Sequence, residues 1–176
     1  MKWTKQRILI LIVDFLIMAA LIVLDQYTKY LAVLHLKDRP AFKIIDGVFE
    51  LNYLENRGAA FGMLQDQKAF FILIACIVLL VIFYVLIKVP YHKKYTPLHP
   101  LLVLISAGAI GNMIDRIRLD YVVDFFYFVL INFPIFNVAD IYVSVACVLL
   151  VLMLLFVYKE EDFDFLDIRQ KKIRKL

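Results

Sequence analysis

The sequence predicts an all-α membrane protein, a bundle of four transmembrane helices with a small β-rich segment outside the cytoplasm. Of the 176 residues, 64% are hydrophobic and only 20% are charged, and the hydrophobic residues gather in four long runs. A soluble domain is closer to half apolar and a quarter charged, so the excess apolar residues must face lipid. Few residues lie outside the runs, and we therefore expect a single integral membrane domain, residues 1–176, without a separate soluble domain.

Four apolar segments are long enough to cross a hydrocarbon layer about 30 Å thick. The first is longer than the apolar core of a signal peptide, and no small-residue cleavage site follows it. We therefore expect it to remain in the protein as a helix. The predicted spans cover residues 8–34, 69–89, 98–117 and 136–158.

The distribution of Lys and Arg predicts the orientation of the bundle. The N-terminus, the connection 88–97 and the tail 159–176 share one side and hold more than half of these residues. By the positive-inside rule both termini are cytoplasmic, and the connections 35–68 and 118–135 lie on the outer side. This arrangement explains the net charge of +4, so nucleic acid is not an expected partner. The charged tail has the composition of a solvated segment, and Tyr158 is placed to act as an interface anchor.

The two outer connections differ in pattern. Residues 49–55 alternate between apolar and polar, and Asp46-Gly47 supplies a turn just before them, which predicts a short strand or hairpin. The connection 118–135 is rich in aromatic and aliphatic residues. We expect it to lie at the membrane interface or to pack against the bundle.

Most polar residues outside the tail converge on the outer membrane boundary in this topology. Asp25 and Lys29 are one helical turn apart and suited to an ion pair, while Asn112, Asp115 and Arg116 share one face of the third span. A charge within a span costs about 2.5–3.5 kcal/mol on insertion scales, so each of these residues needs a partner or a function.

The residue types in this cluster exclude several kinds of catalysis. The histidines form no His-x-x-x-His pair, neither serine lies in a nucleophile elbow, and both cysteines lie inside spans, so zinc, serine and cysteine chemistry are not expected. Carboxylates remain. Asp25 and Asp115 have basic neighbours, whereas Asp124 and Asp140 have none beside them. Two such carboxyls held close together retain one proton near neutral pH, and the pair can activate water and polarise a carbonyl.

Five sequence blocks resemble those of the type II signal peptidases, the bacterial lipoprotein signal peptidases. They occur in the family's order and at its positions relative to four spans, and the resemblance as a whole covers roughly residues 8–158. The blocks are residues 25–29 (DQYTK), 56–61 (NRGAAF), 111–116 (GNMIDR), 123–125 (VDF) and 134–140 (PIFNVAD).

The resemblance implies a membrane-embedded aspartyl endopeptidase of the bacterial cytoplasmic membrane, with its active site near the extracytoplasmic surface. Such an enzyme removes the signal peptide of a diacylglyceryl-modified prolipoprotein just before the lipidated Cys, uses no metal or organic cofactor, and is the target of globomycin. The expected partners are the prolipoprotein and membrane lipid, and we expect a monomer.

The same resemblance assigns roles to individual residues. Asp124 and Asp140 would be the catalytic pair. The residues expected to line or support the substrate site are Asn56, Gly58, Ala60, Asn112, Arg116, Asn137 and Ala139. The polar residues expected to brace that site are Asp25, Lys29 and Asp115. One departure follows the second aspartate, where Ile141 occupies a position at which the family often has a small hydroxyl residue.

Asp14 leaves other hypotheses open, because it lies inside the first span. It could extend along the helix towards Arg7 at the cytoplasmic interface. Alternatively, it could couple protons in a small four-helix transporter, although that hypothesis leaves the outer cluster unexplained. A lipid phosphatase is a third candidate, but its phosphate site would need more basic residues and a histidine.

Overall fold

The computed structural model describes residues 4–58 and 63–166. The helices are α1 (Lys5–Leu36), α2 (Lys68–Lys88), α3 (Leu98–Leu119) and α4 (Val138–Phe156). The strands are β1 (Phe42–Ile45), β2 (Phe49–Asn56) and β3 (Val122–Phe128). Short 3₁₀ helices cover η2 (Lys93–Tyr95), η3 (Val129–Ile131) and η4 (Glu160–Leu166).

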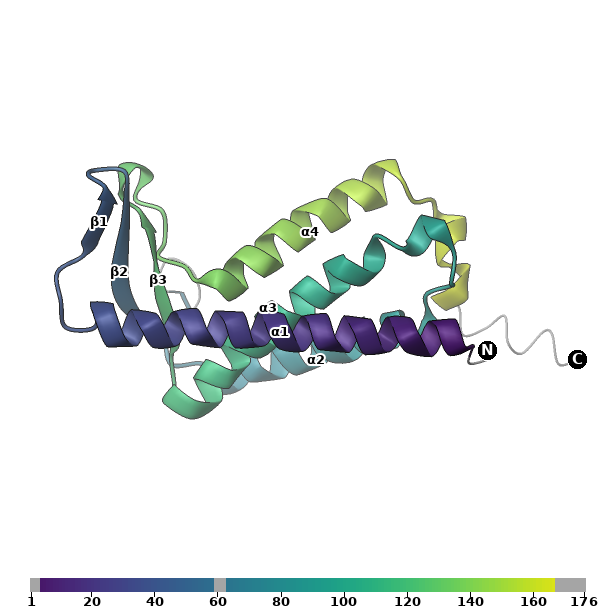
Figure 1. The fold of residues 1–176 in the computed structure, drawn as a ribbon, viewed down its shortest axis with the longest axis horizontal. Coiled ribbons are helices and arrows are strands. Elements are labelled where there is room, and N and C mark those ends of the chain that lie inside the picture. The colour runs from purple at the N-terminus through teal and green to yellow at the C-terminus, as the bar shows by residue number, and fades with distance from the viewer. Residues whose placement is uncertain (1–3, 59–62, 167–176) are drawn as a thin grey trace, which may run out of the picture.

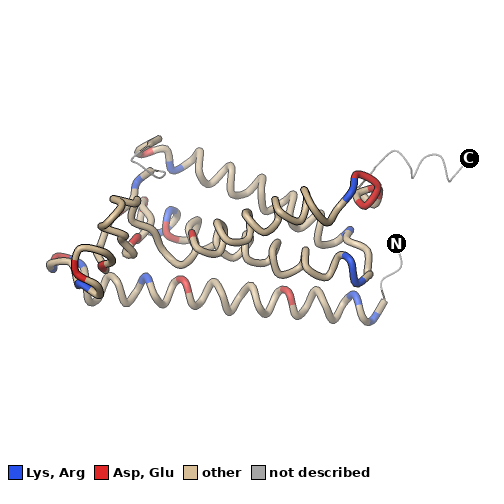
Figure 2. Tube along the Cα trace, turned by 90° about the horizontal axis from the view of Figure 1, so that it is seen from above, with Lys and Arg blue, Asp and Glu red and all other residues tan. Residues whose placement is uncertain are grey.

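All four α-helices are long and apolar enough to cross a membrane. They form one bundle, with the small sheet at one end and the start of α1 near the other (Figure 1). Charged residues gather towards the two ends, and only a few interrupt the helices between them (Figure 2). The predicted fold class, a membrane bundle of four helices with a small β-rich segment, is confirmed.

Local backbone interactions set the helix ends. Thr4 begins α1 by accepting a hydrogen bond from the Arg7 amide at 3.3 Å. Asn137 begins α4 in the same way, accepting from the Asp140 amide at 3.0 Å. Asp120 ends α3 in the left-handed conformation with φ of +69°, which breaks the helical hydrogen-bond pattern and allows β3 to start soon afterwards.

The three strands form an antiparallel sheet in the order β1-β2-β3. β1 and β2 are joined through Gly47, whose φ of +69° is readily adopted by glycine. β3 comes from the connection 118–135 and pairs along β2, for example Tyr127 with Glu50. We expected the connection 118–135 to lie at the membrane interface or to pack against the bundle, and that expectation did not include a third strand. Pairing across so many residues depends on tertiary context rather than on a local signal.

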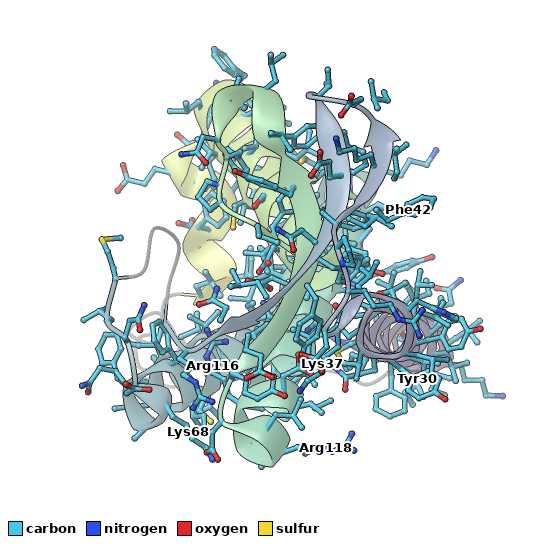
Figure 3. All side chains as sticks on the ribbon, turned by 90° about the vertical axis from the view of Figure 1, so that its left-hand side faces the viewer. Tyr30, Lys37, Phe42, Lys68, Arg116 and Arg118 are labelled. Atoms are coloured by element: carbon cyan, nitrogen blue, oxygen red, sulfur yellow. The ribbon has the colours of Figure 1, made fainter. Side chains whose placement is uncertain are left out.

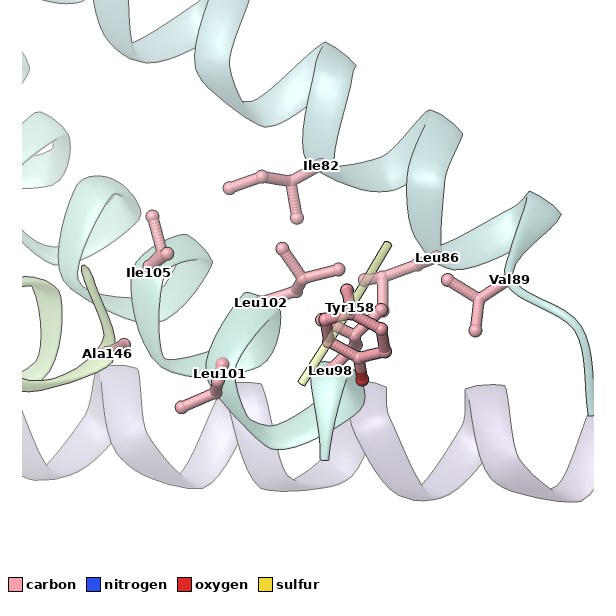
Figure 4. Packing of buried hydrophobic residues seen from close by; sticks show 9 residues of the cluster. All are labelled: Ile82, Leu86, Val89, Leu98, Leu101, Leu102, Ile105, Ala146 and Tyr158. Carbon is pink, nitrogen blue, oxygen red and sulfur yellow. The ribbon is translucent and has the colours of Figure 1, made fainter. Parts of the chain in front are cut away.

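α3 is the central helix of the bundle. Its residues 98–105 contribute to an apolar cluster with α2, α4 and Tyr158 (Figure 4). Towards its other end, Gly108 permits close approach to α4, because a Cβ there would collide with the Ala139 carbonyl oxygen and with Val143. The half of α3 nearer the sheet therefore lies directly against the first turns of α4.

The end of the bundle far from the sheet is more ordered than the sequence indicated. Tyr158 is only 6% exposed and donates from its hydroxyl to the Lys94 carbonyl oxygen at 2.9 Å, so its assignment as an interface anchor was wrong. η4 folds back on this end, and Lys94 Nζ lies 2.5 Å from Asp162 Oδ2. This part of the tail is docked, and residues 167–176 lie outside the described structure.

Asp14 also has a partner at this end. Its Oδ2 lies 2.6 Å from His99 Nδ1 in the first turn of α3. The suggested extension towards Arg7 is not what the structure shows, because Arg7 instead donates to the carbonyl oxygens of Ile87 and Val89 at the end of α2. A histidine from another helix thus accounts for the carboxyl inside α1.

Candidate active site

A cavity of about 490 Å³ lies between the sheet, α3 and the start of α4. It brings Asp124 of β3 together with Asp140 of α4, the two carboxylates that the sequence singled out. The other lining residues are Asn56, Gly58, Asn112, Arg116, Val122, Phe133, Pro134, Ile135, Phe136, Ile141, Ser144 and Val145. A polar wall on one side thus meets an apolar wall built from residues 133–136 and the first two turns of α4.

Asp124 is almost completely buried, with 1% of its surface exposed. Its two carboxyl oxygens accept hydrogen bonds from Asn56 Nδ2 at 2.8 Å and from Asn137 Nδ2 at 2.6 Å. Burial disfavours the charged form, and the negative charge of Asp140 adds to this effect, so the pKa of Asp124 rises to about 7. The carboxyl is therefore able to hold a proton near neutral pH.

Asp140 is fixed by the beginning of its own helix. Asn137 and Asp140 form a capping box of two reciprocal hydrogen bonds. The Asn137 side chain accepts from the Asp140 amide, and the Asp140 side chain accepts from the Asn137 amide at 3.0 Å. Because the Asn137 side chain also donates to Asp124, one residue holds both carboxylates in place. Helix capping and positioning of the acidic pair are thus the same set of contacts.

Asn112 connects this pair to a buried cation. Its Nδ2 donates to Asp140 Oδ1 at 2.8 Å, while its Oδ1 accepts from Lys29 Nζ at 2.8 Å and from Asn137 Nδ2 at 3.1 Å. The side-chain amide is therefore oriented by its partners on both sides. Lys29 acts on the acidic pair through this amide and through its charge.

Lys29 is 3% exposed and is shared as an ion-pair partner by two buried carboxylates. Its Nζ lies 2.9 Å from Asp25 and 3.1 Å from Asp115. Each carboxylate also accepts a backbone amide from the site, Asp25 that of Ala139 at 2.9 Å and Asp115 that of Val123 at 3.1 Å. These two amides belong to the segments that carry Asp140 and Asp124, so the ion-pair network ties α1 and α3 to both.

Arg116 closes another side of the cavity. Its guanidinium donates to the Gly58 carbonyl oxygen at 3.1 Å and lies 4.5 Å from the centre of the Phe71 ring of α2. In the end-on view of Figure 3, it lies on the α2 side of the sheet, away from α1. Gly58 donates to Asn56 Oδ1 at 3.0 Å, and a Cβ at Gly58 would collide with the Met63 carbonyl oxygen. Ala60, also expected near the substrate, lies outside the described residues.

Comparison with known proteins decides the family. The family model for signal peptidase (SPase) II matches residues 17–156. The chain is 46% identical over 141 residues to a lipoprotein signal peptidase of Caldanaerobacter subterraneus subsp. tengcongensis, covering 80% of this chain and 94% of the relative. It is also 46% identical over 143 residues to one from Streptococcus thermophilus, covering 81% and 90%. The chain belongs to the signal peptidase II family.

A solved structure supports the same relationship. A bacterial membrane enzyme determined at 2.3 Å by the in meso method superimposes with a TM-score of 0.74 and 32% sequence identity, covering 84% of this chain and 92% of the other. As a signal peptidase II, the protein is a membrane-embedded endopeptidase of the aspartic type. The transporter and lipid phosphatase hypotheses are therefore set aside.

The signal peptidase II cavity contains residues that sequence reasoning missed. Phe133 and Phe136 line it from the segment before α4, and Ile141, Ser144 and Val145 line it from α4 itself. Ser144 lies four positions after Asp140 and shares its helical face, and Ile141 and Val145, themselves four apart, form the adjacent row. That spacing could have indicated them. The position of the residues before α4 depends on the sheet and has no such local signal.

The site holds carboxylates, side-chain amides and cations, and its carboxylates are already matched with donors of this chain. Among residues 4–58 and 63–166, no group of three His, Cys, Asp or Glu side chains is arranged to hold a metal ion. The chemistry that this arrangement supports directly is acid–base catalysis by the two aspartates.

Proposed function

We propose that Asp124 and Asp140 are the catalytic pair of this signal peptidase II and cleave a diacylglyceryl-modified prolipoprotein just before the lipidated Cys. Prolipoprotein processing is the reaction of the family, and this chain carries it out as a member. The observation that supports the residue assignment is the shared contact with Asn137, which holds both carboxylates at one cavity.

In the proposed reaction, the two carboxyls share one proton. The ionised member takes a proton from water, whose oxygen attacks the scissile carbonyl carbon, while the protonated member donates a hydrogen bond to the carbonyl oxygen. When the tetrahedral intermediate collapses, the C–N bond breaks and the leaving amine receives a proton from the pair. The pKa of about 7 for Asp124 suits it to hold the shared proton at neutral pH.

The supporting residues have distinct tasks in this proposal. Asn56, Asn112 and Asn137 donate to the carboxylates and fix the oxygens that must face water and substrate. Arg116 and Gly58 form the cavity wall towards α2. Lys29, Asp25, Asp115 and the Ala139 amide form the buried brace behind the pair.

We further propose that both termini are cytoplasmic and that the site faces the extracytoplasmic surface, with the enzyme acting as a monomer. The excess of Lys and Arg on the terminal side supports this orientation. A lipid-modified substrate presents its scissile bond near the membrane surface. The cavity lies at the end of the bundle beside the sheet, which suits a bond at that depth.

The test is cleavage of a diacylglyceryl-modified prolipoprotein by the enzyme in membranes. Wild-type enzyme should produce a mass loss equal to the signal peptide, and globomycin should block it. Asp124→Asn and Asp140→Asn should each lower the rate by about 10²–10⁴-fold, the usual contribution of a positioned acid or base.

Asp46→Asn is a matched control, because Asp46 is a highly exposed carboxylate in the β1–β2 turn. It should cleave like the wild type. Normal rates in either dyad variant, at equal amounts of inserted protein, would refute the catalytic assignment.

A further inference from the structure

The sheet ends in an apolar projection outside the active-site cavity. We call residues 128–133, which follow the pairing of Phe128 with Phe49, the sheet tip. Phe136 pairs back with Phe126, so the tip extends past the point where the chain turns towards α4. In Figure 1 it lies at the upper end of the sheet, beyond the beginning of α4.

The side chains of the sheet tip are unusually apolar for an exposed turn. Leu130 is 70% exposed and Ile131 is 69% exposed, and Phe128 and Phe133 are also exposed. A contiguous apolar patch of this kind on a folded protein marks a contact with another molecule or with a membrane.

Close to the tip, the sheet carries an apolar row on one face and a charged row on the other, whereas nearer the bundle Val123 and Phe125 of β3 are buried against α1. Phe42, Leu51 and Phe126 occupy one row of cross-strand neighbours, whereas Lys43, Glu50 and Tyr127 occupy the next. Since successive residues of a strand point to opposite faces, the charged row faces away from the apolar row. The part of the sheet next to the tip thus has the amphipathic pattern of an element that lies in a membrane interface.

A cluster of phenylalanine rings links the tip to the cavity. The Phe128 ring centre lies 4.8 Å from that of Phe49 and 5.9 Å from that of Phe136, and Phe133 lies 5.7 Å from Phe136. Phe133 and Phe136 also line the active-site cavity. The apolar surface therefore continues from the tip, past the cavity, to the exposed apolar side chains of α4.

Those α4 side chains identify the partner. Val148, Leu149 and Leu152 are exposed on a helix that is long and apolar enough to cross the membrane and do not line the cavity, so their surroundings are lipid acyl chains. The sheet tip is continuous with this lipid-facing surface of α4, and the charged row lies on the opposite face of the sheet. Lipid at the membrane boundary therefore also suits the tip.

We propose that the sheet tip inserts Leu130 and Ile131 into the lipid leaflet on the sheet's side of the membrane. The partner is the upper acyl region of phospholipids, with the row of Lys43 and Glu50 kept in water. The insertion anchors the sheet at a fixed depth beside the cavity mouth. This site is independent of which residues carry out catalysis.

Tryptophan fluorescence can test the depth of the tip, because Trp3 is the only tryptophan of the chain. The reporter is the full-length double variant Trp3→Phe/Ile131→Trp, in nanodiscs that each hold one copy and contain phosphatidylcholine with or without bromine on the acyl chains. The control is Trp3→Phe/Lys43→Trp, which places the reporter on the polar row. Trp3→Phe/Leu130→Trp supplies a second tip position if the first variant inserts poorly.

We expect brominated lipid to quench the tip reporter several-fold more than the Lys43 reporter, with emission shifted to the blue. Equal and weak quenching of both reporters would place the tip in water and overturn the proposal. Blue-shifted emission of the tip reporter without quenching would show that protein covers it instead of lipid, and would overturn the proposal as well.

Discussion

The two ends of the bundle use polar residues in opposite ways. At the sheet end, buried charged and amide side chains form a connected network, centred on Lys29, behind a cavity that contains two further carboxylates. At the other end an apolar cluster dominates, and Asp14 is joined to a single histidine. Burying charge usually costs stability, so its concentration at one end indicates where the molecule performs chemistry. Apolar packing at the other end offsets part of this loss of stability.

Removing the buried cation should produce the largest difference between the ends. Lys29→Met leaves Asp25 and Asp115 buried without their counter-charge, and we expect a loss of about 3–5 kcal/mol in the free energy of unfolding. Folded yield should fall more than the turnover of the molecules that do fold, as judged by size-exclusion profiles and by cleavage per folded enzyme.

Asp14→Asn is the corresponding change at the other end, where one neutral hydrogen bond to His99 can remain. It should have the smaller effect on thermal unfolding in detergent. If both variants unfold at the same temperature, the proposed difference between the two ends is wrong.

The ends should also differ in their response to pH. The pKa of Asp124 is raised to about 7, mainly by burial, so the unfolded chain releases this proton at lower pH than the folded protein does. Stability due to Asp124 is fully present below about pH 4 and is lost as pH rises to 7, at about 1.4 kcal/mol per pKa unit. At the other end, the hydrogen bond from Lys94 lowers the pKa of Asp162. The stability that Asp162 contributes is therefore lost only as the pH falls into the acidic range.

Melting temperature measured from pH 5 to 8 tests this difference. The wild type should lose stability across that window, and Asp124→Asn should flatten the slope. Asp46→Asn should leave the slope unchanged, because the Lys43 side chain lowers the pKa of Asp46 and Asp46 therefore titrates below this pH range. Activity should decline above about pH 7 as the shared proton is lost, and identical slopes for the wild type and Asp124→Asn would contradict the protonation argument.

The two helix caps offer a smaller comparison. Asn137→Ala removes the cap of α4 together with contacts to Asp124 and Asn112, and we expect a loss of about 1–2 kcal/mol along with a strong fall in cleavage rate. Thr4→Ala removes a longer, exposed capping bond at the start of α1. Chemical unfolding and cleavage assays on both should show loss of activity only for Asn137→Ala. Normal turnover in that variant would show that capping and catalysis are separable.

The smallest effect is expected at the docked tail. Lys94→Ala breaks the pair with Asp162, which is partly exposed and weakened by solvent. The melting temperature should change less than in the Lys29 and Asn137 variants, and cleavage should be unchanged. A drop in activity would reveal communication between the two ends that the contacts described here do not provide.

The sequence predicted the parts of this molecule that depend on composition and on spacing along one element. Long apolar runs predicted the helices, and the one-turn spacing of Asp25 and Lys29 predicted a contact that the structure contains. The positions of Asp124 and Asp140 relative to the spans predicted that both lie at the same end of the bundle, and the structure brings both to one cavity.

The features that the sequence did not predict depend on distant partners. β3 pairs with a strand far away in the chain, and His99 reaches Asp14 from another helix. Tyr158 is buried between the apolar cluster, Tyr95 and Phe163 of η4. Phe133 and Phe136 join the cavity for the same reason, since the sheet determines where their segment lies. None of these contacts follows from local periodicity.

The pairing of Phe126 with Phe136 has a consequence for how this enzyme can vary. This pairing joins the two ends of the connecting segment, residues 127–135, between β3 and α4. The Phe126 amide donates to the Phe136 carbonyl oxygen, and the Phe136 amide donates to the Phe126 carbonyl oxygen. Residues 129–132 lie beyond this pairing and outside the cavity lining, so they can be exchanged without moving the strand that carries one aspartate or the helix that carries the other. A change within residues 129–132 should therefore leave the two aspartate-bearing segments in register, whereas a change at Phe133 would reach the cavity lining.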